Sequence, residues 1–311
     1  MFDFILEVIA QGLAYGILAI GVTLTYKILD FPDMSADGSF PMGAVIAAIC
    51  LTHNISPVIA MALAFSGGVL AGLVAGYLHV GLKINNLLSG ILVMTGLYSI
   101  NLLIGANRSN IPVFNVPTIF TIGSWSKALS SAQLSLVSSL YPIALLLALV
   151  LIVKFSTDWF LNTKLGFLLR ITGDNPQMVV TLGEDIGKMK IIGLTLSNGI
   201  VAFSGSVIMM LLRYYDITMG SGIVVIGLVS VVLGTTVFGR LKSLKITTLV
   251  VLGSIFYRLC ISLALAVNLP PSNLKLITVL LFIIAIMVNN RSFPQWIERF
   301  KGGKNAKTDS Y

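Results

Sequence analysis

Long, uncharged apolar runs follow one another along almost the whole chain, and short connections between them carry most of the charges. A helix needs about 20 residues to cross the hydrocarbon core of a bilayer, and several of these runs reach that length. Only 10% of the 311 residues are charged, whereas a soluble domain has about 25% charged residues to cover its surface. The pattern excludes a soluble or disordered chain and predicts an all-α, polytopic bundle of membrane helices.

Nine apolar segments are expected within residues 1–290, the predicted transmembrane domain. Their bounds are Phe4–Tyr26, Phe40–His53, Pro57–Val80, Leu87–Gly105, Leu134–Phe155, Ile191–Leu212, Ile223–Gly239, Ile246–Leu269 and Leu276–Val288. The second, seventh and ninth are short for a full crossing, and short, interrupted segments point to a substrate path at the bilayer midplane. In the third segment Gly68, Gly72 and Gly76 recur every four residues. This stripe favours close helix packing within one subunit, with a dimer seam as the alternative.

Lys and Arg are distributed asymmetrically among the connections. If the connection 154–190 and the C-terminal tail lie inside, 15 of the 20 Lys and Arg residues fall on the inner side. Positive residues gather on the cytoplasmic side of membrane proteins, so we predict an outer N-terminus and an inner C-terminus. The basic tail, residues 291–311, can lie against the anionic inner leaflet, and a regulatory role is the alternative. Topology therefore accounts for the formal charge of +8, and no nucleic-acid partner is expected.

Motifs that carry catalysis or bind metal are missing from the sequence. It has no phosphate-binding G-x-x-x-x-G-K-[ST], no H-E-x-x-H and no Cys/His cluster with metal spacing. We therefore expect no enzyme, no catalytic residue, no metal site and no cofactor.

Two polar, glycine-containing stretches stand directly before the second and seventh segments. Broken backbone at membrane depth is tolerated where it is buried in protein or lines a cavity, so we interpret the two stretches as related halves of a translocation pathway. The candidate pathway residues are Asp37, Gly38, Ser39, Phe40, Gly220, Ser221 and Gly222. The alternative is that both stretches are ordinary interfacial loops.

The inner connection 156–190 contains the signature of a very short helix. Asn175 before Pro176 is typical of a helix start, and Gly183 is typical of a helix end. A helix of about two turns is unstable alone in water, so the apolar Met178, Val179 and Leu182 need a partner surface. That partner is another protein or, alternatively, the membrane ends of the same subunit.

The same connection resembles the coupling region of ABC-importer permeases of the branched-chain amino acid and ribose permease family. The likeness covers Gly173-Asp174-Asn175-Pro176-Gln177 and Leu182-Gly183, followed by 194–199 and 202–205. The stretches Ala36–Ala44 and Lys83–Leu92 are similar to tryptophan, tyrosine and other amino-acid permeases encoded beside lipoprotein binding components in bacteria.

The resemblance implies a multi-pass permease of the bacterial cell membrane that imports a small solute, with an amino acid favoured. A separate binding protein would deliver the solute, and the permease would form a homodimer or a heterodimer with a related chain. An ABC ATPase subunit would grip the short helix, so the resemblance implies these coupling residues: Gly173, Asp174, Asn175, Pro176, Gln177, Met178, Val179, Leu182 and Gly183. The alternative is a secondary transporter driven by an ion gradient. Such proteins place acids or histidines within their spans, and here only Glu7 suits that role.

Arg258 is the one Lys or Arg deep inside a predicted span. An intramembrane charge costs about 2.5–3.5 kcal/mol on insertion scales and usually faces the protein interior. An ion pair with Glu7, contact with backbone carbonyls and contact with a substrate carboxylate all stay open. We expect Arg258→Leu to impair assembly or transport. Full solute uptake at unchanged expression would contradict this prediction.

Overall fold

The computed structural model describes residues 2–121, 131–239, 244–266 and 273–289, and these residues are predominantly helical. The basic tail 291–311 lies outside the described residues. The α-helices are α1 Phe2–Thr23, α2 Ala36–Thr52, α3 Pro57–Val80, α4 Asn86–Ile104, α5 Ser131–Leu161, α6 Lys164–Asp174, α7 Pro176–Thr181, α8 Ile186–Leu212, α9 Ile223–Val237, α10 Ile246–Ala266 and α11 Leu274–Asn289. A π-helical turn η1 (Leu24–Ile28) extends α1, a 3₁₀ turn η3 (Ile217–Gly220) precedes α9, and two short strands are β1 (Asn110–Pro112) and β2 (Tyr214–Asp216).

Each of the nine predicted segments overlaps a described helix, and the all-α polytopic class is confirmed, whereas the count of nine membrane segments stays a prediction. Among the described residues, seven helical stretches are long and apolar enough to cross a membrane, while α2 and α11 are shorter apolar helices. The bounds of α3 agree residue for residue with the prediction. Its start is set by Ser56, which caps the first turn by accepting a hydrogen bond from Ile59 N, and by Pro57 directly after it. The prediction for the inner connection needs correction: α5 continues to Leu161, α8 begins at Ile186, and α6 was not expected.

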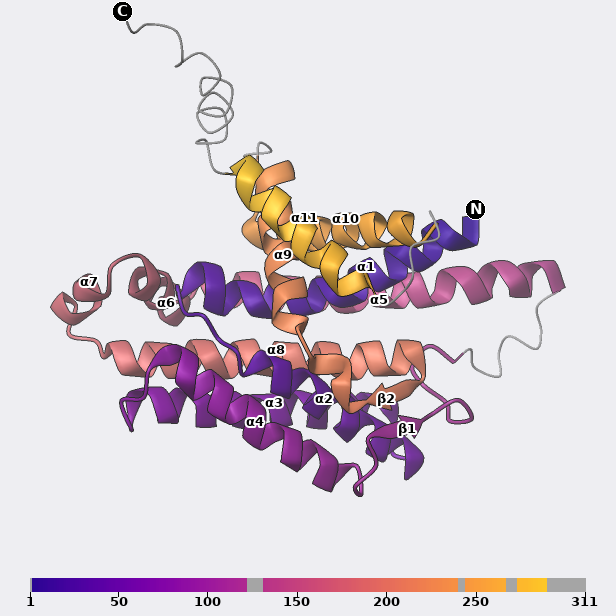
Figure 1. The fold of residues 1–311 in the computed structure, drawn as a ribbon, viewed down its shortest axis with the longest axis horizontal. Helices are drawn as coiled ribbons and strands as arrows, with labels where there is room; N and C mark the ends of the chain where they lie inside the picture. The colour runs from indigo at the N-terminus through magenta and orange to yellow at the C-terminus, as the bar shows by residue number, and fades with distance from the viewer. Residues whose placement is uncertain (1, 122–130, 240–243, 267–272, 290–311) are drawn as a thin grey trace, which may run out of the picture.

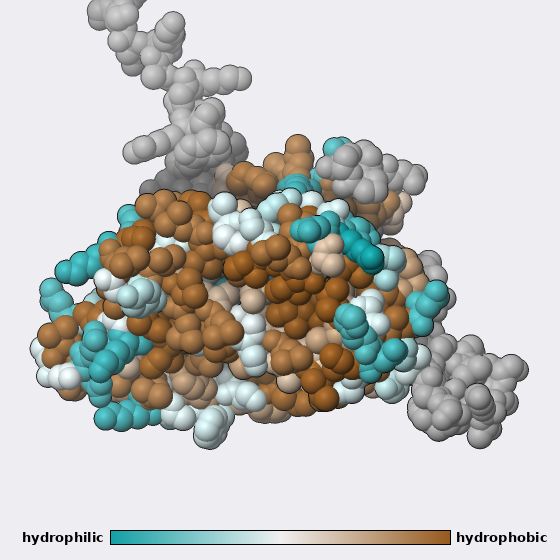
Figure 2. All heavy atoms as spheres, turned by 90° about the horizontal axis from the view of Figure 1, so that it is seen from below, coloured by the Kyte–Doolittle hydropathy of each residue, from teal (hydrophilic) through white to brown (hydrophobic). Residues whose placement is uncertain are grey.

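The helices form an elongated bundle whose two ends differ (Figure 1). The helices α6 and α7 lie at one end, and the N-terminus and the β1–β2 pair lie at the other. Figure 2 shows hydrophobic side chains over the middle of one face and hydrophilic side chains gathered toward both ends. Outward-facing Leu70, Leu103 and Ile152 are each more than 60% exposed, as lipid-facing side chains of a membrane protein are. The opposite placement of the N-terminus and α7 agrees with the predicted topology, which itself stays a prediction.

The glycine stripe of α3 packs against α8 inside the same chain. A Cβ atom at Gly72 would lie 2.7 Å from the Cα of Thr195, and one at Gly76 would lie 3.0 Å from the Cα of Ile191. Such distances leave room for hydrogen alone, so the stripe lets two backbones touch. The interpretation as packing within one subunit is therefore confirmed, and the dimer-seam alternative is not needed for these glycines.

We predict that Gly72→Ala destabilises the fold by about 1–3 kcal/mol, because the new methyl group meets the α8 backbone and α3 must move away. Thermal denaturation of the purified protein in detergent measures the effect. Gly96→Ala in α4 is the matched control, because no atom lies within 4 Å of the Cβ position at Gly96 and Ala has a higher helix propensity than Gly. Equal melting temperatures for the two variants would contradict the packing of this seam.

Candidate functional site

The two interrupted stretches that the sequence singled out meet in the structure at Asp37. This residue lies in the first turn of α2, and its carboxylate accepts hydrogen bonds from Gly222 N (3.0 Å) and Val224 N (2.8 Å) at the start of α9. A carboxylate at a helix N-terminus accepts hydrogen bonds from the free amides, and its negative charge interacts favourably with the positive end of the helix dipole. One side chain of α2 therefore satisfies free amides at the N-terminal end of α9, and we call this contact the α2–α9 junction (Asp37, 220–224).

The junction is closely packed. Gly220 faces the backbone carbonyl of Asp37 and the ring of Pro41 so closely that a Cβ would lie 2.7 Å from the Pro41 Cδ. Among the predicted pathway residues, Gly38, Ser39 and Phe40 are buried, Asp37 and Gly222 are half-buried, and Ser221 is exposed. The structure thus brings the two stretches into contact, whereas their role as related halves of a translocation pathway stays a prediction.

Asp216 in β2 supports the turn that leads into α9. Its carboxylate accepts hydrogen bonds from Thr218 N (2.7 Å), from the Thr218 hydroxyl and from Asn110 Nδ2 (3.3 Å). Partial burial acts to raise the pKa of Asp216, but these hydrogen bonds outweigh it and hold the pKa below its ordinary value. The carboxylate is therefore ionised at neutral pH and fixes the entry to the junction.

A buried polar network joins the loop before α2 to the middle of α8. Asn198 donates from Nδ2 to Asp33 Oδ2 (2.8 Å) and to the Leu194 carbonyl (3.0 Å), and its Oδ1 accepts from the hydroxyl of Ser39 (2.6 Å). Ser35 completes the network by donating to Asp33 from both its backbone N and its hydroxyl. The four side chains Asp33, Ser35, Ser39 and Asn198 are at most 6% exposed.

Sequence reasoning named Ser39 but missed Asp33 and Asn198. The signal that could have found Asn198 is an amide within an otherwise apolar run, because such a group needs partners at membrane depth. The partners themselves lie more than 150 positions away in the sequence, so no local pattern identifies them.

The predicted short helix in the inner connection is α7, and it lies at the end of the bundle opposite the N-terminus (Figure 1). Pro176 occupies its first turn, and Gly183 follows it in the left-handed conformation (φ 76°), as the sequence predicts. Asn175 stands at the N-cap, but its side chain makes no capping hydrogen bond.

The apolar side chains of α7 divide differently from the prediction. Val179 is fully buried within the subunit, whereas Met178, Val180 and Leu182 are 48%, 60% and 52% exposed. We call these three the α7 surface. Of the other predicted coupling residues, Asp174, Asn175, Gln177 and Gly183 are exposed, and Gly173 packs against the backbone of Ile28. Val179 therefore anchors α7 in its own chain. Val180 takes the outward position that the sequence pattern predicts for Val179.

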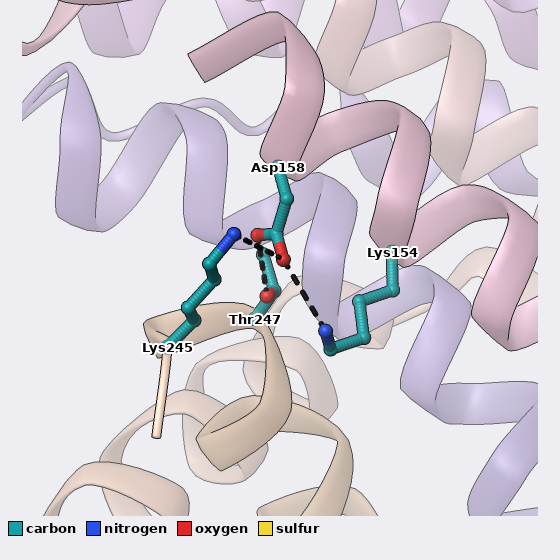
Figure 3. Close-up of polar contacts among 4 residues, drawn as sticks. All are labelled: Lys154, Asp158, Lys245 and Thr247. Carbon is teal, nitrogen blue, oxygen red and sulfur yellow. Dashed lines mark hydrogen bonds and ion pairs between the residues drawn. The ribbon is translucent and has the colours of Figure 1, made fainter. Parts of the chain in front are cut away.

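Asp158 of α5 fixes the start of α10 at the same end of the bundle (Figure 3). Its carboxylate accepts from Thr247 Oγ1 (2.7 Å), Lys154 Nζ (3.2 Å) and Lys245 Nζ (3.4 Å). A second ion pair, Lys164 to Glu184 at 3.5 Å, links α6 to the turn before α8. Lys164 is 83% exposed, so this second pair contributes little to stability.

Arg258 does not pair with Glu7 in the structure. Its guanidinium lies over the ring of Tyr15 at 4.0 Å from the centroid, a cation–π arrangement, and its buried Nε has no hydrogen-bond partner among the described residues. Glu7 instead accepts a hydrogen bond from Gln11 Nε2 at 3.0 Å and is exposed. Of the options left open by the sequence, the ion pair with Glu7 is therefore not formed in the described residues.

Known proteins resemble this chain over nearly its full length. Residues 4–287 match the family described as "Branched-chain amino acid transport system / permease component". A "Tyrosine transport system permease protein" of Clostridioides difficile is 45% identical over 286 residues, which is 92% of this chain and 91% of the relative. The "Probable branched-chain amino acid transport permease protein LivH" of Methanocaldococcus jannaschii is 26% identical over 62% of this chain and 61% of the relative. No solved structure matches the chain.

A family match over 4–287 spans all of the described helices except the first two residues of α1 and the last two of α11, and the polytopic helical fold is what a membrane permease requires. The chain therefore belongs to the family of permease components of branched-chain amino acid transport systems.

Proposed function

We propose that this chain is the membrane permease subunit of a bacterial ABC importer and that its substrate is an aromatic amino acid, with tyrosine the first to test. The observation that carries the proposal is the 45% identity to a tyrosine transport permease over 92% of the chain. A binding protein outside the cell delivers the amino acid, and a separate ATPase supplies the energy. A second permease chain, identical or related, completes the membrane part of the importer.

The shape of the inner end supports engagement of an ATPase through the α7 surface. Met178, Val180 and Leu182 present apolar side chains to the outside at the tip of the bundle, while Val179 ties the helix to its own subunit. A six-residue helix is stable only with such tertiary support. In the proposed cycle the ATPase binds this surface in an ATP-dependent way. It drives transport because it stabilises one arrangement of the permease more than the other.

The rival function, secondary transport, has one structural observation in its favour. Asp33, in the loop between η1 and α2, is a buried acid, and buried acids among membrane helices are the kind of group that such transporters use for ions or protons. Its carboxylate is, however, held by Ser35 and Asn198 in a satisfied hydrogen-bonding network.

Reconstitution in liposomes separates the two functions. We expect tyrosine uptake only when the permease is combined with its ATPase, a tyrosine-loaded binding protein and ATP. Uptake by the permease alone under a proton or sodium gradient would establish the rival function. A binding protein that binds another amino acid would overturn the tyrosine assignment while leaving the importer class intact.

We predict that Val180→Asp lowers ATPase co-purification and ATP-driven uptake at least tenfold, because a carboxylate replaces an exposed apolar contact on the α7 surface. The amount of the variant permease in the membrane should equal that of the wild type, because Val180 is 60% exposed and its replacement leaves the core intact. Leu82→Asp, at a side chain of similar exposure (56%) in the turn after α3, is the matched control. Equal co-purification by the two variants would show that the α7 surface does not engage the ATPase.

The pathway role of the α2–α9 junction is tested by cysteine labelling in a chain whose Cys50 and Cys260 are replaced by Ala. We expect Ser221→Cys to react with a small polar thiol reagent in the resting protein, and Ser39→Cys to be protected because Ser39 is buried. In the assembled importer, ATP should open the junction and expose Ser39→Cys. Protection of that cysteine in every nucleotide state would contradict a pathway at this place.

A further inference from the structure

A cavity of about 420 Å³ with a largely charged lining lies where four helical elements meet. Its lining comes from η1, from the end of α5, from α6 and from the start of α10, and comprises Lys27, Ile28, Asp158, Leu161, Asn162, Arg170, Asp174, Lys245 and Ile246. We call it the basic cavity. It belongs neither to the α2–α9 junction nor to the α7 surface.

Positive charge exceeds negative charge around this cavity. Lys27, Arg170 and Lys245 line it together with two carboxylates, Asp158 and Asp174. Asp158 is already compensated twice, by Lys245 at 3.4 Å and by Lys154, which lies beside the cavity lining, at 3.2 Å (Figure 3). Within the described residues neither Lys27, Arg170 nor Asp174 forms an ion pair, so these three side chains leave one net positive charge to hold an anion.

The cavity lies at the depth of lipid headgroups. The candidate spans Phe4–Ile28 and Leu140–Leu161 end beside it, and the span Ile246–Ala266 begins beside it. Trp159, next to Asp158 on α5, is 72% exposed, and exposed Trp residues mark the interface between hydrocarbon and water. Under the predicted topology this interface belongs to the inner leaflet, where anionic lipids give the surface a negative potential.

We propose that the basic cavity binds a phosphate-bearing anion, and that the headgroup of an anionic phospholipid of the inner leaflet is the occupant. Basic pockets between membrane helices on the cytoplasmic side suit such headgroups. Arg170 can donate a pair of parallel hydrogen bonds to a phosphate, and Lys27 contributes a point charge. The occupant joins η1 and α6, because Lys27 and Arg170 come from these two elements. Lys245, directly before α10, stays paired with Asp158 at the edge of the site.

The experiment measures thermal denaturation of the purified full-length protein in an uncharged detergent. Dioleoyl phosphatidylglycerol is titrated in one arm, dioleoyl phosphatidylcholine in a second, and inorganic phosphate at constant ionic strength in a third. We expect phosphatidylglycerol alone to raise the melting temperature. Each Lys or Arg near an anionic surface contributes about 1 kcal/mol, so Lys27→Gln and Arg170→Gln should each raise the half-saturating lipid concentration about fivefold.

Lys188→Gln is the matched control, because Lys188 is an exposed lysine in the first turn of α8 that does not line the cavity. Its titration should match that of the wild type. An equal response to inorganic phosphate, lost in the same two variants, would support the phosphate site but assign it to a soluble anion. Identical titrations for all three variants, or no response to either anion, would overturn the proposal. Reduced ATPase co-purification by Lys27→Gln and Arg170→Gln without any change in lipid response would also overturn it, in favour of a protein contact.

Discussion

Backbone amides that start a helix within a membrane have no water to bind, so the protein itself must satisfy them. This constraint is severe where α2 and α9 begin, because both are short and both follow an irregular stretch. At α9, the carboxylate of Asp37 accepts hydrogen bonds from the backbone N of Gly222 and of Val224. At α2, the carboxylate of Asp33 accepts a hydrogen bond from the backbone N of Ser35. Helices interrupted at these points are therefore tolerated because two carboxylates supply the missing acceptors.

Close backbone packing holds the two carboxylates in position. Helix α8 touches α3 along the glycine stripe, and it also carries Asn198, which binds both Asp33 and Ser39. A shift of α3 away from α8 would disturb the surroundings of Asn198, because Gly68 packs against the Asn198 backbone. Small residues in the seam and polar residues at its centre thus belong to one structural unit. By contrast, α5 keeps only 17% of its span buried within the described chain, which leaves it free to face lipid or a second permease chain.

The sequence predicted the helices well because the length of an apolar run is a local property. The start of α3 follows from Ser56 and Pro57, and the end of α7 follows from Gly183. Helix α6 was missed because its 11 residues mix charged, glycine and apolar positions without a long apolar run. Which face of α7 packs on the subunit could not be predicted either, because a six-residue pattern does not determine whether Val179 or Val180 is buried.

The candidate site was predictable only in part for the same reason. Two broken stretches before short segments could be related to each other by analogy, but that they touch, through the hydrogen bonds of Asp37, is seen only in the structure. The pairing of Asp33 with Asn198 spans 165 positions and depends on how α2 docks against α8. A carboxyl and an amide that are each unremarkable in a polar loop or a helix become a network only when the tertiary structure excludes water around them.

Helix α8 gives the proposed importer a direct mechanical connection between its two functional regions. It begins at Ile186, five residues after α7 ends, and reaches Asn198 12 residues later. At 1.5 Å per residue this distance is about 18 Å of helix. A helix transmits a displacement along its axis with little loss, so a pull on the α7 surface by the ATPase would act on Asn198 and on the Ser39 that it binds. The start of α2, and with it Asp37 and the first turn of α9, would then move as well. Energy released at the inner tip of the bundle would thereby reach the α2–α9 junction without any contact between the ATPase and the transported amino acid.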